Sequence, residues 1–333
     1  MASATPAPTS CTSLHAAMPS LHHLPAPAKL NLFLHVTGRR ADGYHLLQSV
    51  FVLLDWHDTL HIDTRDDGQL LRHDLNVALP PDDLCLRAAR LLQHESGTPL
   101  GCDIRIHKAV PWGAGLGGGS SDAATVLLAL NQLWGLHWPG ERLEALALQL
   151  GADVPFFVRG LPAWVEGVGE QITPIALPPA LLNTPLALLK PPAAIPTSAI
   201  FGSPLLKRDT PRATVAAFLA APMRYGHNDL QEPAQAWRAP FDAAHPDTQA
   251  SDGRDVIHAL GVMQARFGNS RMTGSGSTVF AWVDGNNPLN STLSADDVTA
   301  LAEAGPHGGH WVGRVCRVLP QHPLLDLAPR TAA

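Results

Sequence analysis

The sequence predicts an α+β fold divided into two domains, and three observations support this prediction. The chain has 333 residues, which is more than one domain usually holds and enough for a substantial core. Segments with alternating apolar residues, typical of strands, are interleaved with segments that carry a helical repeat. A glycine-rich run over residues 113–119 stands directly before a mostly apolar helical stretch. We therefore expect a mixed protein organised around this run.

In the first part of the chain, predicted strands surround predicted helices. Alternating apolar residues over 30–36 predict a strand that carries Lys29 and Asn31 together on its opposite face. Asp66-Asp67-Gly68 has the composition of a hairpin turn. Further strands are predicted over residues 46–54, 59–64 and 102–107, and helices over residues 82–95, 120–133 and 140–150.

The second part carries shorter segments separated by proline and glycine. Short apolar runs between residues 163 and 190 predict strands, and a strand and turn over 163–170 stand near the domain boundary. A Gly-Ser-Gly-Ser turn over 274–277 precedes an apolar strand. Helices are predicted from residues 196, 228, 256 and 294, with a helical hairpin or loop over 203–226, a surface loop over 239–252 and a closing strand over 313–319.

These elements place one domain over residues 25–168 and a second over residues 169–325, with a tail over 326–333. Residues 1–24 are rich in Ala, Pro, Ser and Thr and contain neither acidic residues nor Lys or Arg. Such a segment buries too little apolar surface to become ordered, so a disordered extension is expected. It lacks the positive and apolar regions of a signal peptide, and a translation start at Met18 is an alternative explanation.

Composition and charge exclude several classes of function. Hydrophobic residues make up 45% of the chain and charged residues 16%, which indicates a soluble globular protein. A net charge of -6 argues against a nucleic-acid partner, and no apolar run is long enough to cross a membrane. The four cysteines form no C-x-x-C pair, which fits the cytoplasm. His22-His23 and the pair His307 and His310 lack a third ligand of suitable spacing, so no metal site is predicted.

The glycine run has the features of a phosphate site. Without Cβ atoms, its backbone N–H groups can approach an anion closely. Ser120, Ser121 and Asp122 are good N-cap residues, so a helix is expected to begin there and to point its positive end at the same anion. A flexible linker is the competing interpretation, but a linker is rarely followed at once by a capped apolar helix.

Residues 113–118 also satisfy G-x-G-x-x-G, the dinucleotide-binding fingerprint. A dinucleotide fold needs an acidic residue about 20 positions later at the end of a strand. Glu141 has that spacing, but it begins a helical pattern instead. No Gly-Lys-Ser/Thr follows the glycines, which excludes a Walker A loop. We interpret the run as a third kind of phosphate loop.

The sequence around Asp153 and the Gly-Ser-Gly-Ser turn each allow two interpretations. Asp153 is a lone carboxylate among apolar residues, and such an aspartate is more often an N-cap or turn residue than a catalytic group. Its apolar setting would also suit catalysis, because it excludes water. The Gly-Ser-Gly-Ser turn is either an ordinary hairpin turn or a second place where the backbone approaches a ligand.

Taken together, several segments resemble one family. Pro27-Ala28-Lys29-Leu30-Asn31-Leu32, the glycine run with Ser120-Ser121, and Thr273-Gly274-Ser275-Gly276-Ser277 resemble the three motifs of the GHMP kinases. Residues 40–45, 151–156, 195–197 and 228–230 are similar to a narrower group within the family. That group phosphorylates the 2-hydroxyl of a cytidine-diphosphate ester of methylerythritol in the non-mevalonate isoprenoid pathway. The resemblance covers about residues 25–325.

The resemblance implies a fold and a set of partners. It implies an N-terminal domain similar to ribosomal protein S5 and a ferredoxin-like C-terminal domain. ATP would lie across the glycine run as phosphoryl donor, with Mg²⁺, and a small-molecule alcohol would lie between the domains. No nucleic-acid or membrane partner is expected, and we expect a monomer or weak homodimer in the cytoplasm.

Site residues follow from the same resemblance. Asp153 would accept the proton of the substrate hydroxyl, and the cation of Lys29 would favour its ionised form and orient it. Tyr44 and Phe201 would stack on cytosine, and His45 would hydrogen-bond its edge. The implied ATP-binding residues are Lys108, Pro111, Gly113, Ala114, Gly115, Leu116, Gly117, Gly118, Gly119, Ser120 and Ser121. The implied substrate-binding residues are Asn31, Tyr44, His45, Asp153, Thr197, Phe201, Gly274 and Ser275.

Two departures and three alternatives accompany this interpretation. Ala114 stands where close relatives often carry glycine, so that position should need no left-handed backbone, and Asp122 stands where many carry asparagine. Another GHMP kinase, such as a homoserine or mevalonate kinase, would not need the cytosine residues. A non-catalytic nucleotide-binding protein would have Lys29 or Asp153 altered, which is not the case here. A dinucleotide oxidoreductase would bind NADH.

Overall fold

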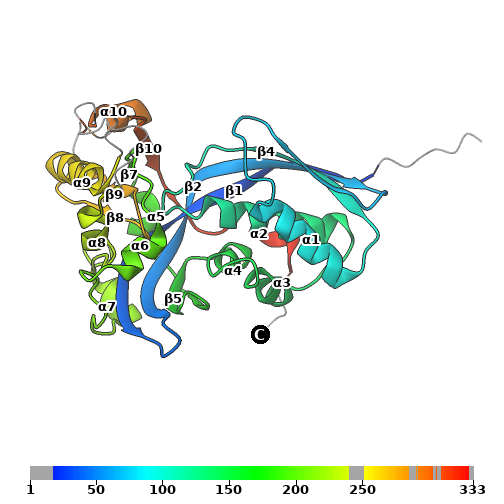
Figure 1. Ribbon diagram of the computed structural model, residues 1–333, viewed down its shortest axis with the longest axis horizontal. Coiled ribbons are helices and arrows are strands. Elements are labelled where there is room, and N and C mark those ends of the chain that lie inside the picture. Colours follow the sequence, from blue (N-terminus) through cyan, green and yellow to red (C-terminus); the bar gives the residue numbers. More distant parts are fainter. Residues whose placement is uncertain are drawn as a thin grey trace, which may run out of the picture.

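The computed structural model describes residues 18–239, 251–284, 290, 292–302, 305 and 309–329. These residues form two β-sheets with helices packed against them (Figure 1). The larger sheet has the strand order β3-β4-β2-β5-β6, and β1 and β11 also pair with β2. The smaller sheet has the antiparallel order β10-β7-β9-β8. The mixed α+β fold predicted from the sequence is confirmed.

The larger sheet is built around two long strands. Its strands are β1 (Ser20–Arg39), β2 (His45–Arg65), β3 (Leu70–Asp74), β4 (Gly101–His107), β5 (Ala163–Gly167), β6 (Gln171–Pro174) and β11 (Val318–Leu319). The first half of β2 pairs with β5 and the second half with β4. The strands predicted over 46–54 and 59–64 are therefore one strand, because pairing with β1 resumes on both sides of a register shift between Pro27 and Lys29.

Helices cover one face of this sheet. They are α1 (Leu84–Ser96), α2 (Gly118–Leu133), α3 (Gly140–Ala147) and α4 (Val154–Arg159). Asp83 caps α1 by accepting a hydrogen bond from the backbone N–H of Leu86, and Gly97 ends it in the left-handed conformation. Helix α2 is buried along nearly its whole length, as its apolar sequence requires, and packs in the largest hydrophobic cluster.

The smaller sheet has its own helices. Its strands are β7 (Leu186–Lys190), β8 (Arg271–Met272), β9 (Val279–Trp282) and β10 (Val312–Cys316). Around it lie α5 (Pro179–Asn183), α6 (Thr197–Gly202), α7 (Val215–Ala220), α8 (Gln231–Ala236), α9 (Gly253–Phe267) and α10 (Ala295–Ala300). Ser294 and Asp297 form a capping box at α10, which fixes where that helix begins.

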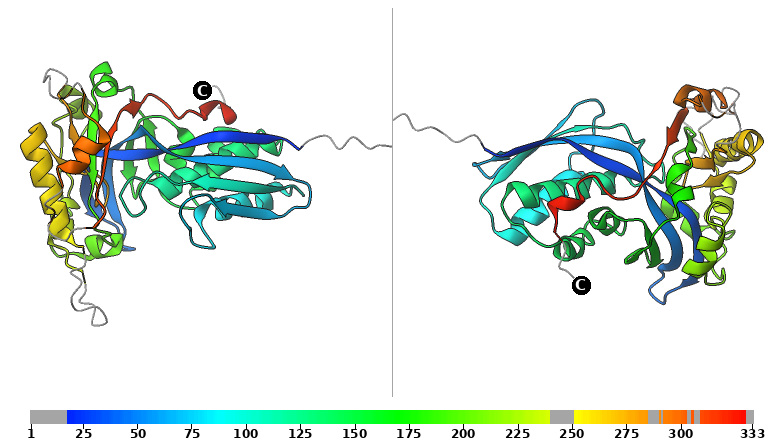
Figure 2. Two further views of the ribbon diagram at one scale, coloured as in Figure 1. Left: turned by 90° about the horizontal axis from the view of Figure 1, so that it is seen from above. Right: turned by 180° about the vertical axis from the view of Figure 1, so that it is seen from behind.

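Strands β1 and β2 connect the two halves of the molecule. Figure 2 shows both strands running from the larger sheet toward the half that holds α9 and β10. Successive parts of β1 join different hydrophobic clusters: Ala26 packs under α2, Leu30 packs with residues of β7 and β9, and Val36 packs with residues of α9. The two halves are therefore joined by shared strands as well as by packing.

Three predictions of local structure need correction. The hairpin at Asp66-Asp67-Gly68 does not form, because β4 lies between β2 and β3, and β3 pairs with it in parallel. Helix α2 begins at Gly118 after an N-cap at Gly117, ahead of the predicted caps Ser120, Ser121 and Asp122. Helices α4 and α5 were not predicted, since each is too short to show a helical repeat.

The structure also differs from the prediction at the two ends of the chain. The disordered extension was expected over residues 1–24, but Ser20 already begins β1, where pairing with Asp63 and its neighbours supplies the backbone hydrogen bonds. Residues 1–17 of that extension, and 240–250 of the loop expected over 239–252, lie outside the described residues. Where the tail over 326–333 was expected to begin, Leu325–Leu327 form a 3₁₀ turn whose last carbonyl accepts a hydrogen bond from Asn131 of α2.

Candidate active site

Two adjoining cavities lie where the two halves of the molecule meet. The larger, of about 850 Å³, is lined by Lys29, Asp153 and the aromatic residues discussed below. The smaller, of about 400 Å³, is lined by the whole of the glycine run. Both cavities share Gly115, Gly117, Ser120, Thr197 and Ser275 in their walls. A ligand in one cavity therefore meets a ligand in the other at the glycine run.

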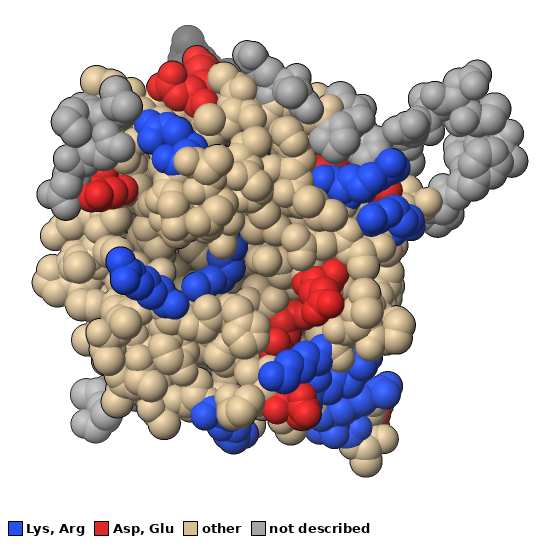
Figure 3. Space-filling view, turned by 90° about the vertical axis from the view of Figure 1, so that its left-hand side faces the viewer, with Lys and Arg blue, Asp and Glu red and all other residues tan. Residues whose placement is uncertain are grey.

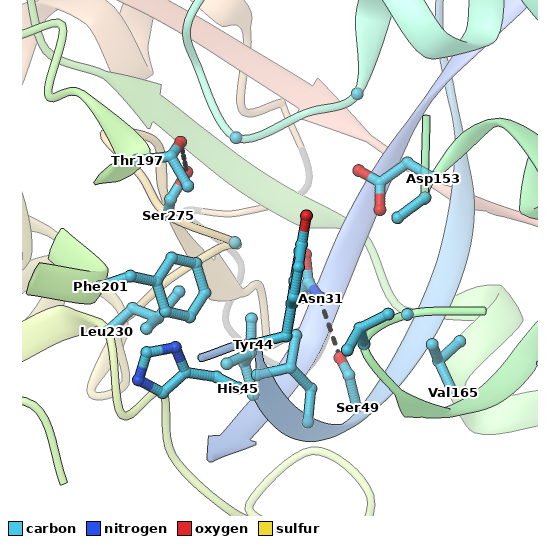
Figure 4. A pocket seen from close by; sticks show the side chains of 18 of the residues that line it. Asn31, Tyr44, His45, Ser49, Asp153, Val165, Thr197, Phe201, Leu230 and Ser275 are labelled. Carbon is cyan, nitrogen blue, oxygen red and sulfur yellow. Dashed lines mark hydrogen bonds between the residues drawn. The ribbon is translucent and has the colours of Figure 1, made fainter. Parts of the chain in front are cut away.

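Lys29 and Asp153 face each other in the larger cavity. Lys29 lies on β1 and is buried, and its Nζ is 3.4 Å from Oδ2 of Asp153. Asp153 precedes α4, but its side chain makes no capping hydrogen bond. About a third of that side chain is exposed, and Figure 4 shows the carboxylate pointing into the cavity. Asp153 therefore occupies the N-cap position of α4, but its carboxylate does not cap the helix and is free to face a ligand.

Lys29 is held in place by several contacts. Its Nζ donates a 2.7 Å hydrogen bond to Oδ1 of Asn31 and lies 4.4 Å from the ring centroid of Phe51. The amide of Asn31 donates in turn to the hydroxyl of Ser49, at 2.9 Å (Figure 4). The backbone N–H of Lys29 donates to the carbonyl of Leu116 in the glycine run. The lysine is thus fixed relative to both Asp153 and the run.

The glycine run needs glycine for space at two positions. Gly115 has φ +73°, and a Cβ there would lie 2.6 Å from the carbonyl oxygen of Thr273. Gly117 has φ +70°, and its Cβ would lie 2.9 Å from the ring of Phe157 and 3.0 Å from Cγ of Lys29. Ala114 is buried, and it is not among the described non-glycine residues that have a positive φ. Its backbone therefore suits alanine, as the sequence predicts.

The predicted ATP-binding residues divide by their position. Gly115, Gly117 and Ser120 line both cavities. Ser121 is fully buried and lines neither cavity, because it lies on the inner face of α2. Its side chain is therefore poorly placed to contact a ligand. The remaining predicted residues line the smaller cavity, namely Lys108, Pro111, Gly113, Ala114, Leu116, Gly118 and Gly119.

The ammonium of Lys108 is engaged by two buried carboxylates. Its Nζ pairs with Oδ2 of Asp58, and with Oδ2 of Asp122 at 2.5 Å. Burial lowers the pKa of Lys108, but Asp122 and Asp58 raise it more, so the net pKa is raised. Asp58 also accepts hydrogen bonds from the backbone N–H groups of Ala109 and Val110. This cluster ties β2 to both ends of the glycine run.

Aromatic side chains form one wall of the larger cavity. The rings of His45 and Phe201 stack with centroids 5.0 Å apart and an interplanar angle of 30°. The side chain of Tyr44 is mostly exposed, and Figure 4 shows it between these rings and Asp153 in that view. Burial lowers the pKa of His45, and the guanidinium groups of Arg208 and Arg39 lower it further. His45 is therefore neutral near pH 7.

The remaining predicted residues line the cavity from the other side. Thr197 begins α6, and its hydroxyl lies 3.0 Å from that of Ser275 in the turn between β8 and β9. Gly274 lies beside the glycine run, where a Cβ would be 3.0 Å from the carbonyl of Gly115. Asn228 holds this turn by donating to the carbonyls of Met272 and Gly274. The Gly-Ser-Gly-Ser turn is thus part of the cavity wall.

The sequence did not reveal every residue of the site. Asp58, Ser49 and Arg208 each contact a predicted site residue but belong to none of the recognised motifs. Asp58 carried the best signal, since it is an acidic residue directly before the strand predicted over residues 59–64. Within the described part of the chain, no group of three or more His, Cys, Asp or Glu side chains is arranged to hold a metal ion.

Comparisons with known proteins agree on one family. Residues 83–161 match the model of the GHMP kinases N terminal domain. The chain is 60% identical over 305 residues to the 4-diphosphocytidyl-2-C-methyl-D-erythritol kinase of Methylibium petroleiphilum, covering 92% of this chain and 97% of that protein. It is 49% identical to the protein of the same name from Polaromonas naphthalenivorans, covering 92% and 95% of the two chains.

Solved structures give the same result. A crystal structure of 4-(cytidine 5'-diphospho)-2C-methyl-D-erythritol kinase is similar with a TM-score of 0.67 and 33% identity, covering 88% of this chain and 98% of that one. The mevalonate kinase of Methanococcus jannaschii has a TM-score of 0.58 at 12% identity, which shows a shared fold.

A glycine run before a helix and a Lys–Asp pair at adjoining cavities, in this fold, are the features of a small-molecule kinase. The chain belongs to the GHMP kinase family, among the 4-diphosphocytidyl-2-C-methyl-D-erythritol kinases.

Proposed function

We propose that this kinase transfers the γ-phosphoryl group of ATP to the 2-hydroxyl of 4-(cytidine 5'-diphospho)-2-C-methyl-D-erythritol, with Asp153 as the base. One observation supports this most directly. The cavity that holds Lys29 and Asp153 shares the wall formed by Gly115, Gly117 and Ser120 with the cavity of the glycine run. An acceptor hydroxyl beside Asp153 would therefore lie next to the terminal phosphate of a nucleotide in the other cavity.

The chemistry assigns a separate task to each group. Asp153 accepts the hydroxyl proton as the oxygen attacks phosphorus, the bond from phosphorus to the bridging oxygen breaks, and ADP leaves. Lys29 orients the carboxylate and keeps a positive charge beside it. The N–H groups of the glycine run and the N-terminus of α2 stabilise the negative charge that builds up on the phosphoryl oxygens.

Mg²⁺ fits this arrangement as an ion that accompanies the nucleotide. Magnesium in kinases is held largely by phosphate oxygens and water, with few protein ligands. Among the residues of the glycine run and the two serines that follow it, Ser120 is the one that has a side-chain hydroxyl and lines both cavities. We therefore propose that this hydroxyl would hold such an ion. When bound, the ion would neutralise charge on the phosphates.

The aromatic wall accounts for the cytidine end of the substrate. Tyr44 and Phe201 present ring faces for stacking, and neutral His45 presents a hydrogen-bonding nitrogen. Asn31, Thr197, Gly274 and Ser275 line the same cavity and are proposed to contact the rest of the substrate.

We also propose that the chain divides into two domains between residues 168 and 169.

We also propose that the protein works in the cytoplasm as a monomer or weak homodimer, without nucleic acid. On the face shown in Figure 3, Lys and Arg side chains stand in separate groups, several of them beside Asp or Glu. Such a surface offers no continuous basic path for a phosphate backbone. None of the helices in the described part of the chain combines the length and apolar character needed to span a membrane.

The test is an ATP-consumption assay with Mg²⁺ and three acceptors: the cytidyl-diphospho-methylerythritol, mevalonate and homoserine. We expect ADP release with the cytidyl substrate alone. Release with one of the other alcohols would retain the phosphate loop and the base but reject the cytosine site. Release with none of the three would reject catalysis of this kind and favour a nucleotide-binding protein.

A further inference from the structure

Arg208 lies behind the aromatic wall and binds both of its sides. Its Nε donates a 3.1 Å hydrogen bond to Nε2 of His45. Its Nη2 donates to the carbonyls of Phe201 and Ser203, at 3.1 and 3.0 Å, and its Nη1 donates to the carbonyl of Leu206, at 3.0 Å. A single guanidinium group therefore connects the start of β2 to the end of α6.

The first contact determines which nitrogen of His45 carries the proton. Arginine remains charged and can only donate hydrogen bonds, so Nε2 of His45 must be the acceptor. A neutral imidazole with an accepting Nε2 carries its proton on Nδ1. His45 therefore offers one N–H donor of defined position to the cavity, and it cannot protonate on Nε2 without losing the bond to Arg208.

The other contacts fix the position of Phe201. The last carbonyls of a helix have no partners within that helix and carry partial negative charge. Arg208 satisfies two such carbonyls at the end of α6, the short helix that also carries Thr197 into the cavity. The ring of Phe201 then packs against His45, whose ring the same guanidinium holds. The distance between the rings of His45 and Phe201 thus depends on Arg208.

We propose that Arg208 is a positioning residue for recognition of the cytosine base: it sets the tautomer of His45 and holds Phe201 at the distance that the base requires. This inference rests on the function proposed above. Arg208 does not belong to the cavity wall itself, so it acts through His45 and Phe201.

The charges around His45 define the expected pH dependence. Arg208 approaches the ring from the segment after α6 and Arg39 from the end of β1, while Asp42, in the same cavity wall, pairs with Arg40. Both cations that act on His45 oppose its protonation. Loss of the charge at position 208 should therefore raise the pH at which His45 becomes protonated and ceases to recognise the base.

The experiment compares Arg208→Gln, which removes the charge, with Arg208→Lys, which keeps the charge without the forked geometry. The exposed neighbour Lys207 supplies the control, Lys207→Ala. We expect Arg208→Gln to raise KM for the cytidyl substrate roughly ten-fold, the effect of losing a charge-assisted hydrogen bond. KM for ATP should stay within about two-fold of the parent value, as expected for sites that do not share the residue.

The pH profile separates positioning from general support of the fold. In Arg208→Gln, the acid limb of kcat/KM for the cytidyl substrate should move to higher pH, whereas Arg208→Lys should raise KM but leave that limb in place. An unshifted limb in Arg208→Gln, or equal rises in both KM values, would overturn the proposal. So would a KM for the cytidyl substrate that is unchanged in both variants.

A measurement without substrate distinguishes this proposal from the proposed function. Long-range ¹H–¹⁵N NMR, with the His45 signal assigned by its loss in His45→Gln, should show the proton on Nδ1 in the parent protein. A parent that shows this tautomer but does not phosphorylate the cytidyl substrate would reject the proposed function. A proton on Nε2 would reject the positioning role, whatever the activity.

Discussion

At the scale of single residues, two lysines beside the cavities, Lys29 and Lys108, differ in their surroundings. Lys29 contacts one partly exposed carboxylate, and Lys108 contacts two fully buried ones. An ion pair with an exposed partner contributes little to stability, so the Lys29–Asp153 pair is better explained by chemistry than by folding. The Lys108 cluster is largely buried at the edge of the smaller cavity, and its charges also affect the free energy of unfolding.

Replacing Asp153 with asparagine tests the proposed base. Asparagine has nearly the same shape but cannot accept the hydroxyl proton, so kcat should fall by about 10²- to 10⁴-fold. Binding of ATP and of the cytidyl substrate, measured by calorimetry, should change little. The exposed Asp66, in the turn after β2, provides the control variant Asp66→Asn. Turnover above a tenth of the parent rate in Asp153→Asn would contradict the assignment.

Replacing Asp122 with asparagine tests the electrostatics of the buried cluster. Burial and the neighbouring Asp58 raise the pKa of Asp122 well above 3.8 despite the opposing effect of the Lys108 ammonium, so the folded protein retains a proton there that the unfolded chain releases. Stability therefore falls as the pH rises above about 4, and this unfavourable contribution is absent from Asp122→Asn. Relative to the parent, the variant should therefore gain unfolding free energy as the pH rises from 5 to 8.

Urea unfolding at the two pH values gives this difference, and Asp66→Asn again serves as the control. A variant whose stability relative to the parent falls with rising pH would show that ionised Asp122 stabilises the protein through Lys108. That result would reverse the assigned direction of the Asp122 pKa.

At the scale of elements, the glycine run and helix α2 form one unit with β1. The run is bonded to β1 through the backbone of Lys29, and its last glycines open α2. The Asp58 cluster ties the entrance of the run to Asp122 of helix α2. The N–H groups that we expect to bind phosphate are therefore fixed before a nucleotide arrives, which lowers the entropy cost of binding.

Two alanine substitutions test whether space or conformation makes glycine necessary. Gly113 and Gly117 both have positive φ, but a Cβ at 113 would meet nothing within 4 Å, whereas one at 117 would clash with Phe157 and Lys29. Gly113→Ala should cost about 1 kcal/mol of stability through backbone strain alone. Gly117→Ala should cost about 1–3 kcal/mol more through the clash and should also weaken ATP binding.

Chemical denaturation and nucleotide titration of both variants give these values. Equal losses of stability in the two variants would show that the run moves freely enough to accommodate a side chain. In that case, the close packing of Gly117 against Lys29 would not position the proposed catalytic pair.

At the scale of the whole molecule, the site exists because the two halves meet. Lys29 comes from β1, Asp153 from the segment before α4, Thr197 from α6 and Ser275 from the turn between β8 and β9. Long strands that pass through both halves keep these elements together. The two cavities share part of their walls, so both substrates can be bound at once.

This arrangement predicts direct transfer within a ternary complex. Initial rates measured against both substrates should give intersecting double-reciprocal lines, because both substrates bind before any product leaves. Labelled ADP should not exchange into ATP when the cytidyl substrate is omitted, since no phosphorylated enzyme forms. Parallel lines together with such exchange would instead require a covalent intermediate and a nucleophile that we have not assigned.

The sequence by itself determined the features that depend on local chemistry. It predicted the phosphate loop, because a glycine run directly before an apolar helix is compatible with few other structures. It also placed Lys29 and Asn31 on one face of a strand, because side chains along a strand alternate between its two faces. Only the tertiary structure decided that Lys29 meets Asp153, that Asp58 lies beneath the loop and that Arg208 reaches His45. These pairs are far apart in the chain, and strand register and core packing, rather than local residue patterns, bring them together.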